Sequence, residues 1–384
     1  MMPSVGMSFP WTYASMPYGT LDLLRGCNVS CPGCYNGPGR LVKPLRQVIT
    51  ELHQMLTLRR LHTVVLVGGE PTLHPQLVDI VRYIASQRLH VSLLSNGVLL
   101  DAVLLGRLKA AGLHAVYLHI QCGQQRPDAP EHPTPEQLRA LRRHKAELIA
   151  AHGLEVGLSA IAYKSRLSEI RELVTEVIES PCIRLLLVTE FTDPGKFAGL
   201  TGDVRSGLRG PPPSDACPSD MDAEEVCSQD ILELMDAQGM QPFAHLGSSR
   251  DVREPRWLLY LVGVVQTPEG PVRAASLRSS LSDRLLIRLP YWLFKRHAAW
   301  YQAGPAIFRL QLIFNAISGG AWRESIRLLM ASWRRRAELK HKHLLFQQGP
   351  TLAADGAVVF CRDCPDATML RGRLVPLCLA DRMA

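Results

Sequence analysis

Short apolar runs alternate with longer amphipathic stretches through the first 190 residues, and this alternation constrains the fold most strongly. The apolar runs predict β-strands over residues 20–24, 63–69, 90–96, 114–120, 154–163 and 183–191. The stretches between them predict helices over residues 45–59, 75–88, 101–111, 135–151 and 168–179. Thr134 and Ser168 are the expected N-caps of the last two helices. Six strands in series with helices between them indicate an α/β fold with a parallel sheet, either a barrel or a doubly wound sheet.

The rest of the 384-residue chain follows a Gly/Pro-rich segment, which suggests a second domain. The boundaries we expect are an N-terminal extension, a core domain, a linker and a C-terminal domain, over residues 1–17, 18–200, 201–216 and 217–384. In the last of these, residues 222–238 and 281–343 have helical patterns.

Positive charge is concentrated in the predicted helices of the C-terminal domain. From Arg284 to His343 the chain carries twelve Lys and Arg residues against two Glu, within a net charge of +8. Aromatic residues interleave with these arginines, as in a helix that lies on an anionic membrane, although a helix packed on the core with a solvated basic face has the same pattern. We expect no nucleic acid partner, because no nucleic-acid-binding module accompanies the charge.

The sequence contains ten cysteines, and we expect no export signal on this chain. The first twenty residues lack a basic patch followed by an apolar core, and no apolar run reaches the roughly 18 residues that cross a bilayer. We therefore expect a cytoplasmic protein, either free or peripheral at the inner face of the membrane. Disulfides are disfavoured there, so the cysteines indicate metal ligation.

Three cysteines, Cys27, Cys31 and Cys34, lie within eight positions directly after the first predicted strand. Soft thiolates at this spacing suit a four-iron cubane, with one iron left open for a ligand. A structural zinc ion is the alternative, and it needs a fourth nearby ligand, for which His53 and His62 are the candidates.

Polar and glycine residues stand where the predicted strands end. In parallel α/β folds the active site lies at the carboxyl ends of the strands, and glycine lets backbone approach a ligand closely. The same residues could instead form turns or satisfy backbone groups. The candidates for cofactor or substrate contacts are Gly68, Gly69, Glu70, Pro71, Ser95, Asn96, Gln121 and Glu190.

The three-cysteine loop, followed by a Gly-Gly-Glu stretch after the second strand, resembles the radical S-adenosylmethionine superfamily over residues 18–192. The resemblance implies a partial (β/α)6 TIM-like barrel with a C-terminal, mostly helical, cysteine-containing extension. It also implies that Cys27, Cys31 and Cys34 hold a [4Fe-4S] cluster that binds S-adenosylmethionine. One departure is Gly33, where many members carry an aromatic residue.

By the same resemblance, Gly68 and Gly69 would offer backbone groups to the methionine amine of the cofactor, with Glu70 nearby. Ser95 and Asn96 would reach its ribose or carboxylate. An electron from a donor such as flavodoxin or ferredoxin would cleave the cofactor to a 5′-deoxyadenosyl radical, which abstracts hydrogen from an unactivated C–H bond. A lipid or other small molecule is the expected substrate, and a peptide or pterin is the alternative. A non-catalytic iron–sulfur or zinc-organised binding protein is the alternative of another class.

A second cysteine group lies near the end of the sequence. Cys361, Cys364 and Cys378 suit a zinc knuckle or an auxiliary [4Fe-4S] cluster, with Cys217 or Cys227 as the fourth ligand. The closing sequence resembles the subgroup that contains archaeal tetraether lipid synthases and pterin methylase-like proteins, and many radical S-adenosylmethionine enzymes carry an auxiliary cluster at this end. We therefore expect the auxiliary cluster.

Overall fold

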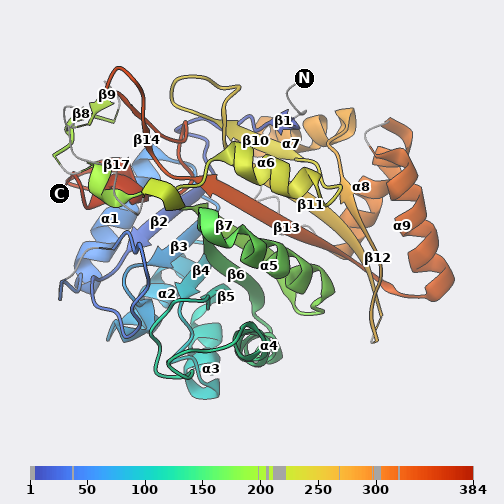
Figure 1. The fold of residues 1–384 in the computed structure, drawn as a ribbon, viewed down its shortest axis with the longest axis horizontal. Helices are drawn as coiled ribbons and strands as arrows, with labels where there is room; N and C mark the ends of the chain where they lie inside the picture. The colour runs from blue at the N-terminus through green and yellow to red at the C-terminus, as the bar shows by residue number, and fades with distance from the viewer. Residues whose placement is uncertain are drawn as a thin grey trace.

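The structure is a computed structural model that describes residues 5–36, 39–197, 199–204, 207–210, 222–267, 269–295, 297, 304–318 and 321–383 (Figure 1). Its α-helices are α1 (Leu45–Leu58), α2 (Leu77–Ser86), α3 (Ala102–Ala111), α4 (Pro135–Ala151), α5 (Leu167–Glu179), α6 (Ser228–Asp236), α7 (Leu281–Phe294), α8 (Pro305–Ser318), α9 (Trp322–Arg335) and α10 (Leu377–Ala380). Its strands are β1 (Met7–Ser8), β2 (Tyr18–Asp22), β3 (Thr63–Val67), β4 (His90–Ser95), β5 (Leu113–His119), β6 (Glu155–Ala162), β7 (Ile183–Glu190), β8 (Thr201–Asp203), β9 (Gly207–Arg209), β10 (Ala244–Gly247), β11 (Pro255–Thr267), β12 (Gly270–Leu277), β13 (Glu338–Gln348), β14 (Thr351–Leu352), β15 (Val358–Val359), β16 (Ala367–Leu370) and β17 (Arg373–Pro376).

Strands β2 to β7 lie side by side in chain order, and all five pairs are parallel. Helices α1 to α5 connect them and pack outside the sheet (Figure 1). The strands are apolar because the helices and the interior bury both faces, as Leu66, Leu118 and Leu158 show by being at most 1% exposed. The fold class is therefore α/β with the (β/α)6 order of a partial barrel, and the sheet is open, since β2 forms one of its ends.

For most of these elements, the bounds predicted from local sequence signals lie within two residues of the observed bounds. Helix α4 begins where the predicted helix does, because Thr134 and Gln137 form a capping box at its N-terminus. Ser168 is not the N-cap of α5: a 3₁₀ turn over Lys164–Arg166 leads directly into the helix, so that Arg166 occupies the N-cap position.

The C-terminal half of the chain extends the same sheet. Strand β13 pairs parallel with β7 and antiparallel with β11, and β10 and β1 follow beyond β11. The prediction of a helix up to residue 343 is wrong from Glu338 onward, because β13 fills the place between two long strands and gains backbone hydrogen bonds on both sides. Lys342 lies buried in this strand and donates to the carbonyls of Ser180 and Ile183.

Helices α8 and α9 pack on strands β11 to β13 at the end of the molecule away from the (β/α)6 unit (Figure 1). Helix α7 packs against α8, and the carbonyl of Lys295 at its C-terminal end accepts from Arg60 of the (β/α)6 unit at 3.1 Å. Close to the second cysteine group, β16 and β17 form a hairpin. The division into domains at residues 200 and 217 stays a prediction. In the described part of the chain, no helix has the length and apolar character to span a membrane.

Candidate active site

The three-cysteine loop leaves β2 at the carboxyl end of the parallel sheet and is anchored to two later strand ends. Ser30 exchanges backbone hydrogen bonds with Gln125, which follows β5, at 3.1 and 2.9 Å. The hydroxyl of Tyr163, directly after β6, donates to the carbonyl oxygen of Pro32 at 2.5 Å. The loop therefore lies where parallel strands place an active site.

Two glycines after β3 let backbone segments approach each other closely beneath this loop. The amide of Gly69 donates to the carbonyl of Leu24 at 2.7 Å, and the amide of Glu70 donates to that of Gly26 at 2.9 Å. A Cβ atom on Gly69 would lie 2.1 Å from the Gly26 carbonyl oxygen, and one on Gly68 would lie 2.7 Å from that of Leu24. Glycine is thus needed here for packing against the chain that enters the cysteine loop.

The carboxylate of Glu70 is buried and joins the ends of β3 and β4. It accepts hydrogen bonds from the Ser95 hydroxyl at 2.8 Å and from the Asn96 amide at 2.7 Å. It also accepts from the backbone and hydroxyl of Thr72, which begins the short turn after Pro71. Glu70 therefore holds Ser95 and Asn96 in place rather than pointing to open solvent.

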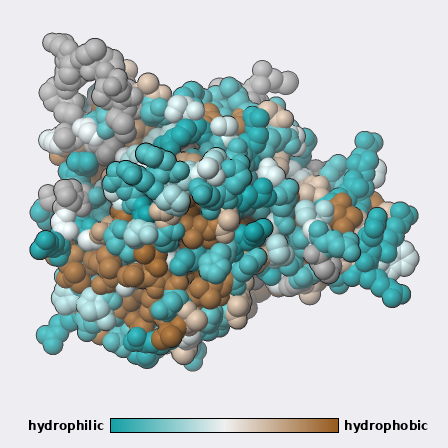
Figure 2. Space-filling view, turned by 60° about the horizontal axis from the view of Figure 1, so that its bottom comes forward, coloured by the Kyte–Doolittle hydropathy of each residue, from teal (hydrophilic) through white to brown (hydrophobic). Residues whose placement is uncertain are grey.

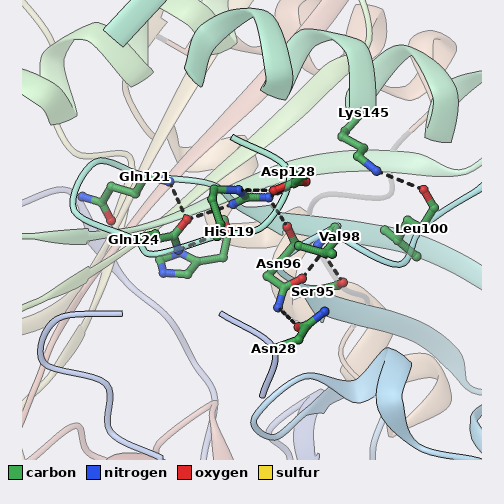
Figure 3. A network of polar contacts seen from close by, with 12 residues as sticks. Asn28, Ser95, Asn96, Val98, Leu100, His119, Gln121, Gln124, Asp128 and Lys145 are labelled. Atoms are coloured by element: carbon green, nitrogen blue, oxygen red, sulfur yellow. Dashed lines mark hydrogen bonds and ion pairs between the residues drawn. The ribbon is translucent and has the colours of Figure 1, made fainter. Parts of the chain in front are cut away.

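Two amide side chains reach from strand ends to the thiols, and Figure 3 draws these two side chains, Asn96 and Gln124. Asn96 donates to Asn28 at 2.7 Å and lies 3.7 Å from the sulfur of Cys27. Gln124 donates to the sulfur of Cys31 at 3.3 Å. Hydrogen bonds to cluster ligands orient the thiolates and tune the metal that they hold.

Arg126 is buried at the centre of this network. It forms a two-point ion pair with Asp128 at 2.7 and 3.1 Å, and it donates to the Gln124 side chain and to the Asn96 carbonyl, both at 2.9 Å. The sequence analysis missed Gln124 and Arg126. The signal that could have found them is the polar run "QQRPD", which begins five residues after β5 ends.

Burial changes the acidity of the thiols in the loop. It raises the pKa of Cys31 to about 11, although the hydrogen bond from Gln124 acts in the opposite direction. It also raises the pKa of Cys34, and the neighbouring Cys27 adds to the shift. Thiolates in such a place need a positive charge beside them, which metal ligation provides. The donor set of three thiols with amide donors fits an iron–sulfur cluster.

The histidines considered as zinc ligands lie elsewhere. His53 is on α1, where its ring contacts the Tyr83 hydroxyl at 2.8 Å. His62 precedes β3 at the opposite end of the sheet from the cysteines and stacks on His90. Neither is placed to complete a tetrahedral site with Cys27, Cys31 and Cys34.

Gln121 connects two neighbouring strand ends. Its side chain donates to the Ile161 carbonyl at 2.6 Å and to Glu169 at 3.2 Å, and it accepts from the Ile161 amide at 2.8 Å. These side-chain hydrogen bonds take the place of the backbone hydrogen bonds that one more residue pair between β5 and β6 would make. Cofactor contact by Gln121 stays a prediction.

The end of β7 lies between the two cysteine groups. Phe191 contacts the first one, because a Cβ atom on Gly33 would lie 2.3 Å from its ring. Glu190 is buried, accepts from the Ser228 hydroxyl at 3.3 Å, and interacts electrostatically with Cys361 of the second group. Successive residues of an extended chain point to opposite faces, and for this reason Phe191 is directed to the first cysteine group and Glu190 to the second. Glu190 therefore lies beside the second cysteine group.

The second group brings Cys361, Cys364 and Cys378 into mutual electrostatic range. Burial raises the pKa of Cys361 and of Cys364 well above the usual thiol value. The buried guanidinium of Arg59 interacts with Cys364, and both residues line a cavity of about 350 Å³. Cys227 is exposed one residue before Ser228, so it lies near Glu190, which accepts from the Ser228 hydroxyl.

Cys217, predicted as a further ligand, lies outside the described residues. Within the described ranges, no three His, Cys, Asp or Glu side chains are grouped closely enough to hold a single metal ion. Ligation by either cysteine group stays a prediction.

Comparison with known proteins identifies relatives over the first half of the chain. Residues 21–176 match the family model of the radical SAM superfamily. The PqqA peptide cyclase of Methylobacterium sp. (strain 4-46) is 31% identical over 181 residues, which are 44% of this chain and 45% of that protein. Molybdenum cofactor biosynthesis protein 1 of Mus musculus is 35% identical over 116 residues, which are 27% of this chain and 17% of that protein.

Among solved structures, Streptococcus suis SuiB bound to S-adenosylmethionine aligns with 59% of this chain and 47% of its own, at a TM-score of 0.41 and 17% identity. The chain spans less than half the length of the curated relatives named here.

Proposed function

Because residues 21–176 belong to the radical SAM superfamily, whose members are enzymes that use a [4Fe-4S] cluster and S-adenosylmethionine, we propose that this chain cleaves S-adenosylmethionine reductively and abstracts hydrogen from an unactivated C–H bond. Cys27, Cys31 and Cys34 would hold the cluster. The observation that supports this assignment is the pair of amide side chains, Asn96 and Gln124, directed at two of the three thiols.

The chain's own residues would position the reacting groups. When bound, the cluster would supply the electron for the cleavage. Gln124 and Asn96 would orient the thiolates, and Arg126 would keep both amides in place through its bonds to the Gln124 side chain and the Asn96 carbonyl. Glu70 would hold the end of β4 against the turn after β3, where Gly68 and Gly69 would offer backbone groups to the cofactor.

We also propose an auxiliary [4Fe-4S] cluster on Cys361, Cys364 and Cys378, with Cys217 or Cys227 as the fourth ligand. The buried thiol of Cys361, the cavity beside Cys364 and the cationic Arg59 support it, because a guanidinium stabilises nearby thiolate charge. Because Glu190 and Phe191 lie between the two cysteine groups, the auxiliary cluster would lie close to the first one.

A lipid remains the first substrate class that we propose, because exposed apolar and basic helices in the C-terminal half suit an apolar molecule with an anionic head. Such a substrate would bring the protein to the membrane surface as a peripheral protein. A peptide is the second candidate, and the PqqA peptide cyclase among the relatives supports it. A flavodoxin or ferredoxin would donate the electron.

The test is anaerobic purification followed by iron and sulfide analysis and an assay for 5′-deoxyadenosine. We expect roughly four irons per cubane, hence about eight in total. The Cys31→Ala variant should lose cleavage, whereas Cys182→Ala, a change between α5 and β7, should retain it. The Cys361→Ala variant should lower the iron content without removing the first cluster.

Zinc in place of iron, with no cleavage after reconstitution, would contradict the proposal and indicate a metal-organised binding protein. If the Cys31→Ala variant retained its iron and its cleavage activity, the three-cysteine loop would not be needed for the reaction. Iron content unchanged in Cys361→Ala would leave the second group without a cluster.

A further inference from the structure

Helices α7, α8 and α9 expose apolar side chains on one face each. They include Trp333 at 81%, Ile317 at 79% and Leu281 at 68% exposed. Within each helix these side chains recur every three or four positions, so each set forms a continuous stripe. In Figure 2 the lobe at the right, which carries α9 in Figure 1, shows apolar side chains between hydrophilic ones. The outer apolar face, as we name it, comprises Leu281, Leu285, Leu289, Leu293, Ile307, Leu310, Phe314, Ile317, Trp322, Ile326, Met330 and Trp333.

The opposite face of each helix is packed on the sheet. Ile287 of α7, Phe308 of α8 and Leu328 of α9 are buried in one core with strands β11 to β13. Gly263 of β11 lets α8 and α9 lie close, since a Cβ atom there would meet Leu328 at 2.6 Å and Phe308 at 3.3 Å. The exposed stripes are therefore additional apolar surface, directed away from a core that is already complete.

Buried polar contacts set the positions of the helices relative to one another. Gln311 of α8 donates to the carboxylate of Asp283 of α7 at 2.9 Å, and the Ser280 hydroxyl donates to the side-chain oxygen of Asn315 at 2.5 Å. All four residues are at most 5% exposed. The outer apolar face is thus built on a fixed arrangement of helices.

Positive charge borders the stripes. The three helices carry seven arginines, all exposed, against two acidic residues. One of the acids, Asp283, is buried and hydrogen-bonded, and the other, Glu324, is half-buried and paired with Arg327. Two copies meeting through this face would bring fourteen arginines together, which opposes self-association. A surface that is both apolar and anionic matches the face better.

A basic cavity of about 670 Å³ lies between β12 and α9 at the edge of the outer apolar face. Arg273 and Arg278 line it from β12 and the residues that follow, and Arg323 and Arg327 line it from α9. Glu324 also lines it, with its carboxylate 3.8 Å from Arg327, so four arginines face one acid. Trp322 belongs to both the cavity and the apolar stripe. Guanidinium groups bind phosphate oxygens in pairs, so the cavity offers a place for a phosphate group beside an apolar surface.

We propose that α7, α8 and α9 dock this protein on a bilayer that contains anionic phospholipid. The outer apolar face enters the interface between headgroups and acyl chains, and the arginines beside it contact anionic headgroups. The cavity between β12 and α9 receives the phosphate of one headgroup. This surface lies apart from the three-cysteine loop. The docking proposal rests on the peripheral membrane location proposed above and names its surface and lipid class, and vesicle binding is measured without the reaction proposed at the loop.

The test is co-sedimentation of the full chain with vesicles of phosphatidylcholine alone or mixed with phosphatidylglycerol. We expect binding to the mixed vesicles that weakens as salt is added. An Ile317→Ser/Trp333→Ser variant and an Arg273→Gln/Arg278→Gln variant should each bind about ten-fold more weakly. Val103→Ser, at a 71% exposed position on α3, and Arg143→Gln, at an exposed position on α4, are the matched controls and should bind as the parent does.

Circular dichroism should show that all four variants remain folded, since the changed side chains are on the surface. Equal binding to both kinds of vesicle, or no binding at low salt, would overturn the proposal. A dimer in light scattering that the Ile317→Ser/Trp333→Ser change dissociates would assign the face to a second copy. Loss of soluble glycerol phosphate binding in the Arg273→Gln/Arg278→Gln variant, with vesicle binding unchanged, would assign the cavity to a soluble phosphorylated ligand.

Discussion

The side-chain amide of Gln124 donates a hydrogen bond to the sulfur of Cys31 across 3.3 Å. The orientation of that amide is set by its oxygen, which accepts from the Gln121 backbone at 3.1 Å and from Arg126 at 2.9 Å. Its nitrogen must therefore face the thiol and the His119 carbonyl. A residue that no motif identified is thus directed at a proposed cluster ligand.

Replacing Gln124 with leucine should make the midpoint potential of the first cluster more negative, because an N–H donor to a ligand sulfur stabilises the reduced, more negative state. Formation of 5′-deoxyadenosine should slow by roughly ten-fold. Redox titration followed by electron paramagnetic resonance measures the potential. Gln87→Leu, at an exposed position after α2, is the control. An unchanged potential with normal iron content would show that the bond does not tune the cluster.

The Gly69→Ala substitution should destabilise the protein by about 1–3 kcal/mol, because its Cβ atom would lie 2.1 Å from the Gly26 carbonyl oxygen and force the backbone apart. Urea unfolding measures the loss. Gly106→Ala is the matched control: its Cβ atom would meet nothing within 4 Å and lies in α3, where alanine is favoured by about 0.5–1 kcal/mol over glycine. If the Gly69→Ala variant were as stable as the parent, the turn after β3 and the chain that enters the cysteine loop could move apart at no cost.

The buried ion pair between Arg142 of α4 and Glu176 of α5 should be essential to the packing of these helices. Glu176→Gln should cost about 3–5 kcal/mol, since it leaves a guanidinium without its counter-charge at a site less than 10% exposed. Arg139 and Glu179 join the same helices nearby, but both are about half exposed, so Glu179→Gln should change stability by less than about 1 kcal/mol. Similar losses in the two variants by urea unfolding would argue against the role of burial.

The stack of His62, His90 and His114 should make the protein less stable in mild acid. Burial, with His90 and Lys109 nearby, lowers the pKa of His114 from 6.5 to about 4, and burial also lowers the pKa of His90. Unfolding therefore takes up protons, and stability should fall as the pH drops from about 6.5 toward 4.

The measurement is the free energy of unfolding in urea at several pH values between 7.5 and 4.5. The His114→Asn variant should lose part of the decline, while His132→Asn, at an exposed position, should keep all of it. If the free energy of unfolding declined with the same slope in the parent and in the His114→Asn variant, the histidine stack would not be the cause of the decline.

Sequence alone determined the elements whose signals are local. The capping box of Thr134 and Gln137 and the apolar periodicity of α4 involve residues a few positions apart, so helix 135–151 was predicted with its observed bounds. The order of six strand and helix patterns likewise predicted the parallel sheet, because short crossovers leave few other topologies. The cysteine loop and the Gly-Gly-Glu stretch were visible as motifs for the same reason.

Tertiary structure decided everything that depends on contacts between distant segments. Gln124 and Cys31 are 93 positions apart, and no local pattern indicates that β5 ends beside the cysteine loop. Glu190 belongs to the second cysteine group because the alternation of β7 turns it away from Phe191. Strand β13 resembles a helix by composition, but its backbone hydrogen bonds to β7 and β11 outweigh local propensity. A side chain's role is set by the neighbours that folding brings to it, and these lie outside any sequence window.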